Sequence, residues 1–415
     1  MSNSIFARFF VSRLRFSAVV FLLGFVFGHL ISEQRILLFP ELSPLGSLPS
    51  SLEDTNVGDY YCLPPLNEPR YPSVPSYNAL PTELLTAAQD LISQTPITPL
   101  FVPFTRNHLM IRQTILSYIA AGWPPSQIFI IDNSGTMDAN LHGLLSDTNP
   151  FHLNYTLYRS RYGVNIMRTP TLLSFAQLQN LMLFTAMAKG WSHYYWTHQD
   201  IAVLSDEDKR PYKSLYENVL SSLISLYPTM NLTTAKRVGQ RWGIVWYSFD
   251  WLTLVNVAAA TEGGVGAWDT FIPYYHTDCD YYERLRLMDF PILEKHVGEI
   301  YDLAEHITDP EYRFFGDEEN GTEVESARFK MLKMELNMLM KAKAQSSRNT
   351  WQDELKGGEG EPWTYDPKGF QTAWWDMASA GRAIFKKKWG TSACKPSNDG
   401  KTLSRMWNET NDSKP

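Results

Sequence analysis

A short run of residues able to do chemistry follows a strongly aromatic segment near the middle of the chain. Residues 193–197 read His-Tyr-Tyr-Trp-Thr and lead directly into His198-Gln199-Asp200. We expect the aromatic segment to be a buried strand, so that the Asp200 carboxylate emerges at a sheet edge. Open α/β sheets hold their ligands at that edge. His198 either ligates directly or orients Asp200.

A second group of acidic residues lies about eighty residues later. Asp278 and Asp280 follow a Tyr-Tyr-His-Thr segment, and His296 comes after them. Carboxylate oxygens with one imidazole suit a hard divalent cation, Mn²⁺ or Mg²⁺, that holds a diphosphate. We take Asp200 as the first metal ligand and His296 as the second, with His306 as a competing choice. The alternative for Asp200 is a strand-end aspartate that caps a turn.

The Asp278/Asp280 pair is also suited to general acid–base catalysis. Residues two apart on a strand face the same side, so both carboxylates are expected to point into one cleft. Asp278 is the preferred general base for an acceptor hydroxyl, and Asp280 is the second choice. The alternative is that Asp280 caps the start of a helix.

Three further residues are candidates for holding a nucleotide. Asp132 ends the apolar run Ile128–Ile131 and has oxygens for ribose or base, although Asp-Asn-Ser-Gly is also a good turn. Arg106 and Arg161 are candidates for phosphate, because a guanidinium matches phosphate geometry. Each arginine taken alone is more often a surface ion-pair partner.

The bulk composition is that of a globular protein. Of the 415 residues, 13% are aromatic and 20% charged, and the net charge is −7, which argues against nucleic-acid binding. Three cysteines are too few for a disulfide scaffold. A single Cys62–Cys394 bridge is an open alternative, and Cys279 is expected to be a buried thiol.

The N-terminus carries a membrane signal. Arginines precede an apolar run at 16–31 that a second apolar stretch extends to about residue 39, without a small-residue cleavage site. The basic flank leaves the tail 1–15 cytosolic and the remainder in the ER or Golgi lumen, as in a single-pass type II protein. A cleaved signal peptide is the alternative, because the apolar run is slightly shorter than a full membrane span. Five glycosylation sequons fit a lumenal body. They begin at Asn154, Asn231, Asn320, Asn408 and Asn411.

The remaining chain divides into four parts. Residues 40–96 form a Pro/Ser-rich stem, and 97–309 alternate apolar strands with helical patterns. Residues 310–400 are a helical extension whose Lys386–Lys388 run is expected to be a solvated helix end, and 401–415 are expected to be disordered. The alternation predicts an α/β domain with a mainly parallel sheet flanked by helices.

Individual elements can be assigned within 97–260. Strands are expected at 98–104, 128–131, 155–158 and 193–197. Helices are expected from Asn107 to Ala121 and from about Thr171 to Lys189. The apolar block 242–260 is long enough to suggest a second membrane span, but Asp250 and Asn256 favour a buried strand and helix.

In this order the elements at 97–306 resemble the GT-A fold glycosyltransferases, especially the family 2-like group, in the form of a fungal type II protein. The resemblance implies that Thr105-Arg106 lies beside the nucleotide and that Asp132 lies near its base and ribose. It also implies that 198–200 corresponds to the metal-binding Asp-x-Asp motif, with His198 in place of its first aspartate. Between the positions of Asp132 and Asp200 the family has a strand, a glycine-containing loop and a helix, and residues 159–180 can supply these elements.

Two later motifs extend the resemblance. The glycine-rich segment 263–269 fits the acceptor region, and 277–280 with Arg284 or Arg286 fits the motif that carries the general base. The motif of processive polysaccharide synthases is missing, because Gln240-Arg241-Trp242 fits it poorly. Tryptophans at 242, 246 and 268 are candidates for stacking on sugars, although core packing is the default.

The resulting prediction is a metal-dependent transferase that moves a sugar from a nucleotide-sugar donor to a glycan, protein or small acceptor. A nucleotidyltransferase is the rival enzyme, but it requires a glycine-rich loop with Lys or Arg after the first strand, which residues 105–108 lack. A non-catalytic lumenal carbohydrate-binding or scaffold protein of the same fold is the alternative from another class.

Overall fold

The computed structural model describes residues 62–66, 97–207, 209, 211–226, 229–231, 236–238, 241–316, 322–346, 355–361 and 366–407. The predicted tail and anchor, most of the stem and the sequons at Asn320, Asn408 and Asn411 lie outside these ranges. Within them, no helix has both the length and the apolar character required to cross a bilayer.

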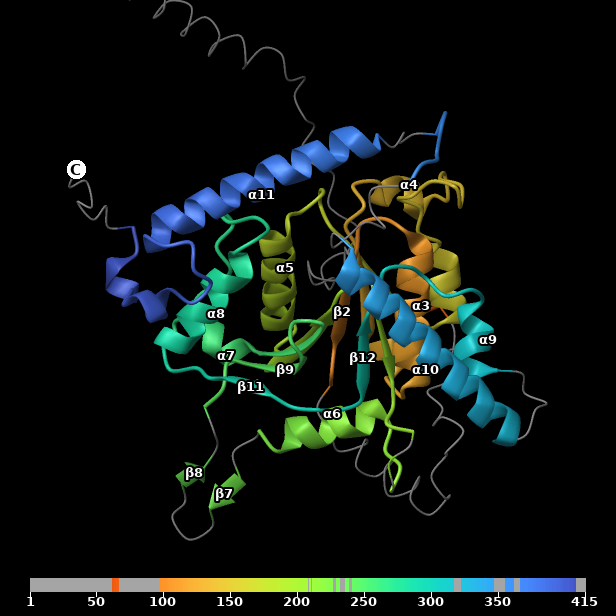
Figure 1. Cartoon of the computed structure of the whole chain (residues 1–415), viewed down its shortest axis with the longest axis horizontal. Helices are drawn as coiled ribbons and strands as arrows, with labels where there is room; N and C mark the ends of the chain where they lie inside the picture. The colour runs from red at the N-terminus through yellow and green to blue at the C-terminus, as the bar shows by residue number, and fades with distance from the viewer. Residues whose placement is uncertain are drawn as a thin grey trace, which may run out of the picture. The chain divides into compact units, whose positions relative to one another are not determined.

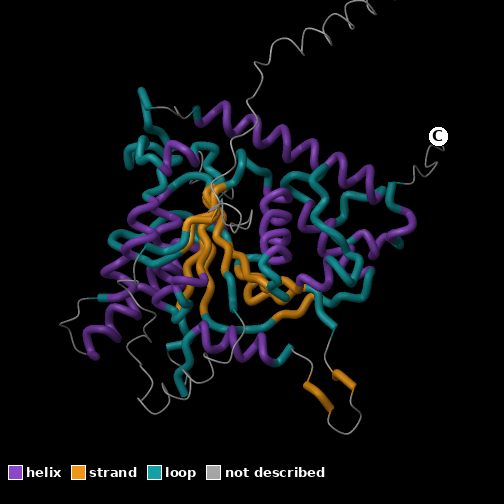
Figure 2. Tube along the Cα trace, turned by 180° about the vertical axis from the view of Figure 1, so that it is seen from behind, coloured by secondary structure: helices purple, strands orange, loops and turns teal. Residues whose placement is uncertain are grey.

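A large mixed sheet forms the centre of the described part (Figures 1 and 2). Parallel pairing joins β4, β3, β2 and β5, and the sheet becomes antiparallel where β10 pairs with β5 and β9. In spatial order its eight strands are β1 (Cys62–Leu63), β4 (Asn165–Arg168), β3 (Ile128–Asp132), β2 (Leu100–Phe104), β5 (His193–Thr197), β10 (Leu252–Asn256), β9 (Ile244–Ser248) and β11 (Ile292–Glu294). The predicted α/β class with a mainly parallel sheet is therefore found, with antiparallel pairing of β1 at one edge and of β10 on the other side.

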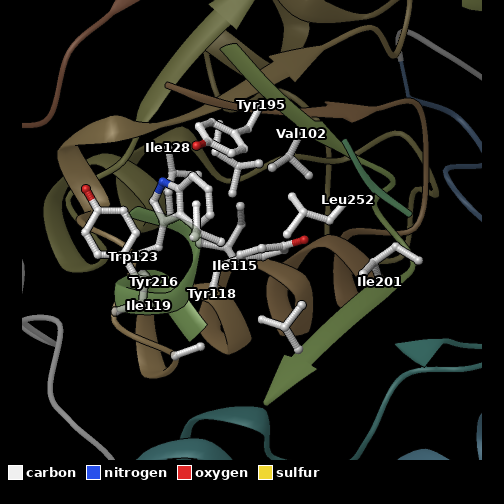
Figure 3. Packing of buried hydrophobic residues seen from close by; sticks show 14 of the residues in the cluster. Val102, Ile115, Tyr118, Ile119, Trp123, Ile128, Tyr195, Ile201, Tyr216 and Leu252 are labelled. Carbon is white, nitrogen blue, oxygen red and sulfur yellow. The ribbon is translucent and has the colours of Figure 1, made fainter. Parts of the chain in front are cut away.

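Both faces of this sheet are buried. Alternate residues of β2 point to opposite sides, so Leu100 and Val102 join one apolar core and Phe101 joins another. The first core contains α3 (His108–Ala120) and α6 (Leu215–Ile224); Figure 3 shows Trp123 at its centre. The second contains α5 (Phe175–Ala188), α7 (Val257–Ala260) and α8 (Thr277–Leu287). The result is three layers, helix–sheet–helix.

The two helices predicted in the first half are present, and their start signals are capping residues. Asn107 accepts a hydrogen bond from the backbone N–H of Met110 and caps α3. A reciprocal capping box between Ser174 and Gln177 starts α5, a few residues later than expected. The block 242–260 folds as β9, β10 and α7, which confirms the interpretation of that block as buried strand and helix.

A small second sheet and three later helices complete the site region. β6 (Ile201–Leu204) continues directly from Asp200 and pairs with β12 (Glu299–Asp302). The short helix α9 (Pro310–Phe315) follows, and α10 (Thr322–Gln345) runs beside β12 (Figure 1). The helix α11 (Pro367–Trp389) packs on α8 through Phe385 and Trp389. Short elements elsewhere are α4 (Met137–Leu141) and the hairpin β7 (Thr229–Asn231) with β8 (Lys236–Val238).

Three local predictions were wrong. Residues 155–158 belong to a helical segment that continues as a π-turn over Leu157–Arg161, because the Asn154 side chain accepts from the backbone N–H of Leu157 and starts a turn. Of the Lys386–Lys388 run, Lys386 and Lys387 are exposed at the end of α11 as expected, but Lys388 is buried. Residues 401–407 are ordered, with a 3₁₀ turn at Leu403–Arg405.

The cysteine pairing also differs from the prediction. Cys279 and Cys394 form a disulfide, so Cys279 is not a thiol and Cys394 is not joined to Cys62. Cys62 lies instead in β1, opposite Met167 of β4. The bridge joins the segment after α11 to the helix that carries Asp278 and Asp280.

Candidate active site

A cavity of about 420 Å³ opens at the carboxyl ends of β2 and β5. It lies where the sheet changes from parallel to antiparallel pairing, next to β10. Its polar wall comes from the loops after β2 and β5, from the turn between β9 and β10, from the end of β12, from the start of α8 and from α10. The residues concerned are Arg106, His198, Asp200, Asp250, Asp278, Asp302 and Lys343.

Gln199 holds the two strand-end loops together. Its side-chain oxygen accepts from the backbone N–H of Thr105 at 3.0 Å, and its side-chain amide donates to the backbone carbonyl of Arg106 at 2.5 Å. Thr114 of α3 donates to the Gln199 backbone carbonyl. These bonds join the two loops that carry Arg106 and Asp200, both of which line the cavity.

A buried ion cluster lies at the end of β5. Lys343 Nζ is 2.6 Å from Asp200 Oδ2 and 2.5 Å from Asp302 Oδ1. Burial works against the charge on Asp200, but Lys343 and His198 outweigh it and lower the pKa of Asp200. Burial and the Asp200 charge raise the pKa of Asp302 despite Lys343. Burial also works against the charge on Lys343, but the two carboxylates outweigh it and raise the pKa of Lys343.

Asp278 lies in the first turn of α8 and lines the cavity. His276, in the left-handed conformation with φ 71°, precedes the helix and turns the chain into it. Burial raises the pKa of Asp278, although backbone N–H donors of the helix start oppose the shift. A carboxylate with a raised pKa at a cavity wall is suited to accept a proton.

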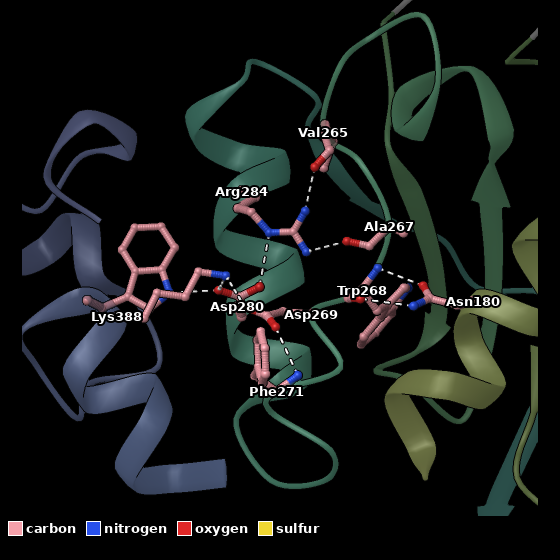
Figure 4. A network of polar contacts seen from close by, with 10 residues as sticks. Asn180, Val265, Ala267, Trp268, Asp269, Phe271, Asp280, Arg284 and Lys388 are labelled. Carbon is pink, nitrogen blue, oxygen red and sulfur yellow. Dashed lines mark hydrogen bonds and ion pairs between the residues drawn. The ribbon is translucent and has the colours of Figure 1, made fainter. Parts of the chain in front are cut away.

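Asp280 does not share that position, because α8 is a helix and not the expected strand. Its carboxylate is fully buried and accepts from Arg284 Nε at 3.0 Å and Trp389 Nε1 at 2.9 Å. Lys388 Nζ lies 2.7 Å away and also binds Asp269 (Figure 4). Asp280 therefore joins α8 to α11 and is not among the residues that line the cavity.

Arg106, predicted to hold the nucleotide, and His198, predicted to ligate or to orient Asp200, both line the cavity. The Arg106 guanidinium is only 5% exposed and stacks over the Phe370 ring, 4.3 Å from its centroid. His198 stacks on Phe175 at 6.0 Å and lies against Trp196. Both side chains are held by aromatic contacts at the wall.

Asp132, also predicted to bind the nucleotide, is fully buried beneath the wall. It accepts hydrogen bonds from the Ser134 backbone, from Asn140 and from Tyr155 at 2.8–2.9 Å. Burial raises the pKa of Asp132 even against these donors. Its neighbour Asn133 lines the cavity in its place.

Arg161 and His296 lie among other partners. Arg161 pairs with Glu311 of α9, which also binds Arg112 at 2.6 Å. His296 is more than half exposed and lies 2.9 Å from Asp206. Neither residue, nor His306, is among those that line the cavity, so Asp200 and His296 are not brought together in this structure.

Several cavity residues were missed by the sequence analysis. Asp302 is the last residue of the short strand β12, and an aspartate at a strand end was the signal available. Lys343 has no local signal, because only the packing of α10 brings it to β5. The aromatic lining was also missed: it comprises Phe175, Trp196, Phe249, Trp251, Tyr274, Tyr275, Phe370 and Trp374. The three tryptophans that were singled out, at 242, 246 and 268, are buried in the core instead.

The residues as placed do not fit a divalent cation at Asp200. The Lys343 ammonium lies between the two carboxylates that a metal would need. Elsewhere in the described ranges, Asp278, Cys279 and Cys394 offer ligand atoms within 4.8 Å of one another, but the two sulfurs are joined in the disulfide and provide no thiolates.

No protein-family model matches the chain, and no curated protein matches it in sequence. Among solved structures, the chain is similar to the mannosyltransferase PcManGT from Pyrobaculum calidifontis in complex with GDP-Man and Mn²⁺. The two are 11% identical, and the match covers 73% of this chain and 93% of that chain, with a TM-score of 0.29. A TM-score this low carries no argument, so function has to be inferred from the site itself.

Proposed function

We propose that the protein is a glycosyltransferase that uses a nucleotide-sugar donor. The observation that carries the proposal is the cavity at the carboxyl ends of β2 and β5, which combines a guanidinium, several carboxylates and an aromatic wall. Its volume of about 420 Å³ suits a small-molecule substrate. Carboxylates bind sugar hydroxyls, and aromatic rings pack on the apolar faces of sugars or bases.

Arg106 is the proposed contact for the donor diphosphate. Its guanidinium lies over the Phe370 ring, and its backbone carbonyl accepts a hydrogen bond from Gln199. A fixed fork of N–H donors can bind two phosphate oxygens at once, which a flexible lysine does less well. The diphosphate would then lie between Arg106 and the end of β5.

Asp278 is the proposed general base of an inverting transfer. The acceptor oxygen attacks the anomeric carbon while the bond from that carbon to the diphosphate breaks. The electron pair of the broken bond leaves with the nucleoside diphosphate, and the acceptor proton passes to Asp278. The raised pKa of Asp278 favours this last step.

The divalent cation predicted at Asp200 and His296 is not part of this proposal, because Lys343 lies at Asp200 and His296 binds Asp206. The compartment is proposed to be the secretory lumen, with residues 16–39 as a type II anchor. The Cys279–Cys394 disulfide supports an oxidising compartment, and Asn154, the first of the sequons, is exposed.

A donor screen on the full chain tests the proposal. UDP- and GDP-sugars are added to the wild type and to Asp278→Asn, and thermal stability and donor hydrolysis are measured. We expect one donor to raise the melting temperature of both proteins, because binding stabilises the folded state, and only the wild type to turn it over.

Asp289→Asn is the matched control, since Asp289 is exposed in the turn after α8 and asparagine tolerates its left-handed backbone. This variant should behave as the wild type does. Stabilisation by oligosaccharides without stabilisation by any nucleotide would favour the carbohydrate-binding alternative instead.

A further inference from the structure

An ammonium ion occupies the centre of the carboxylate pair at the end of β5. Lys343 Nζ lies within 2.6 Å of both Asp200 and Asp302. Asp302 ends β12, and Asp200 directly precedes β6, the strand that pairs with β12. Lys343 is 5% exposed and Asp200 is 7% exposed. Two buried carboxylates around one point are stabilised by a cation or by a shared proton, and here the protein supplies a cation.

The position of Lys343 is built into the fold. Phe329, Leu332 and Leu336 of α10 are buried against Ala202 of β6 and Tyr301 of β12. These contacts fix α10 along the same two strands whose ends carry Asp200 and Asp302. The Lys343 side chain therefore reaches the cluster from a packed helix, and it does so at the wall of the cavity.

We propose that Lys343 is the resident cation of the donor site and stands where a divalent metal would otherwise be held. The inference rests on the proposed function and deepens it: the diphosphate of the donor is recognised by Lys343 together with Arg106, without a metal ion. An ammonium has three N–H donors, and the two bonds to Asp200 and Asp302 leave one for a phosphate oxygen.

The charges of the cluster bear on this role. Two carboxylates and one ammonium carry a net charge of −1, which is unfavourable next to a diphosphate. Arg106 adds the positive charge that faces the leaving group.

Direct measurement of Mn²⁺ binding tests the inference without any need for activity. The full chain is titrated with Mn²⁺ and followed by electron paramagnetic resonance, with the wild type beside Lys343→Met and Lys341→Met. Lys341 lies on the same helix but is exposed, so it is the matched control. We expect no stoichiometric Mn²⁺ binding in the wild type or Lys341→Met, and one site in Lys343→Met, where the carboxylates lose their cation.

Nucleotide binding in EDTA is the second measurement. UDP and GDP are titrated into each variant with EDTA and then with excess Mn²⁺. In EDTA we expect the wild type to bind and Lys343→Met to bind 10- to 100-fold more weakly, as expected for a lost charge-assisted hydrogen bond. Lys343→Arg, which keeps the charge, covers the case in which the methionine variant does not fold, and it should bind within 10-fold of the wild type in EDTA.

Two results would overturn the inference while leaving the proposed function intact: nucleotide binding by the wild type that requires Mn²⁺, or one Mn²⁺ bound by the wild type and lost in Asp200→Asn. Absence of nucleotide binding in every condition would overturn the proposed function and the inference with it.

Discussion

Asp278 and Asp280 are two residues apart on the first turn of α8, yet their carboxylates lie in opposite surroundings. Asp278 lines the cavity, whereas Asp280 is fully buried between Arg284, Lys388 and Trp389. With 3.6 residues per turn, two positions along a helix turn a side chain by more than half a circle. Because of this rotation, Asp278 faces the cavity and Asp280 contacts α11.

Asparagine substitutions should separate these two roles. Asp278→Asn should lower transfer or donor hydrolysis by about 100-fold or more, because a general base contributes that much, and should leave stability nearly unchanged. Asp280→Asn should lower the free energy of unfolding by about 3 kcal/mol, because it leaves the buried Arg284 and Lys388 without their carboxylate. Urea unfolding and a donor-turnover assay on both variants measure the difference.

The pH profile gives a second check on Asp278. Its raised pKa means that kcat/KM should fall as the pH drops through that pKa, since the protonated carboxyl cannot act as a base. Asp278→Asn should lose this limb of the profile. An unchanged limb in the variant would assign the base to another group.

The two arginines predicted to bind phosphate should respond differently to removal. Arg106→Ala should weaken nucleoside diphosphate binding by about 10- to 100-fold, because one charge-assisted contact is lost. Arg161→Ala should leave binding unchanged, since Arg161 is paired with Glu311 away from the cavity. Calorimetric titration with UDP and GDP measures both, and equal losses in the two variants would contradict the placement of the donor.

A buried histidine should make stability depend on pH. His193 of β5 is 2% exposed, and burial lowers its pKa to about 4, against about 6.5 in the unfolded chain. The unfolded chain therefore binds the proton more readily, so stability is retained above pH 6.5 and is lost as the pH falls toward 4. The loss from this one residue is on the order of 3 kcal/mol.

Urea unfolding of the wild type and His193→Gln at several pH values between 4.5 and 7 checks this. Other titrating groups contribute equally to both proteins, so the difference between the two curves isolates His193. The variant should show the shallower dependence, and parallel curves would mean that His193 is charged in the folded protein.

Removal of the disulfide should cost stability. The bridge closes a segment of 115 residues, and a crosslink of that length is worth about 4–5 kcal/mol through the unfolded chain. Cys394→Ser should therefore unfold at much lower urea concentration than the wild type. Cys62→Ser, which keeps the bridge, is the control and should change the midpoint little.

The elements with local signals could be predicted from the sequence. Continuous apolar runs gave β2, β3 and β5, and caps such as Asn107 gave the start of α3. The position of Asp200 at a strand end followed from the same pattern. The segment 155–158 was misread because its aromatic residues suit a strand, while a side-chain turn at Asn154 decides its conformation.

The contacts between distant segments could not be predicted. Lys343 binds Asp200 although the two residues are 143 positions apart, and no local sequence pattern near either residue indicates this ion pair. Cys394 has two possible partners by sequence, and only the packing of α11 on α8 selects Cys279. The separation of Asp278 from Asp280 likewise depends on a helix that the pattern Thr-Asp-Cys-Asp does not specify.

The position of Cys394 in the chain has a consequence for biosynthesis. Synthesis runs from the N-terminus, so Cys62 and Cys279 are both made before Cys394, and the native bridge becomes possible only after Cys394 has been added. In the meantime Cys62 and Cys279 can be oxidised to each other. A chain released early, or oxidised too quickly, would hold β1 to α8 in a non-native crosslink, and its rescue requires thiol–disulfide exchange.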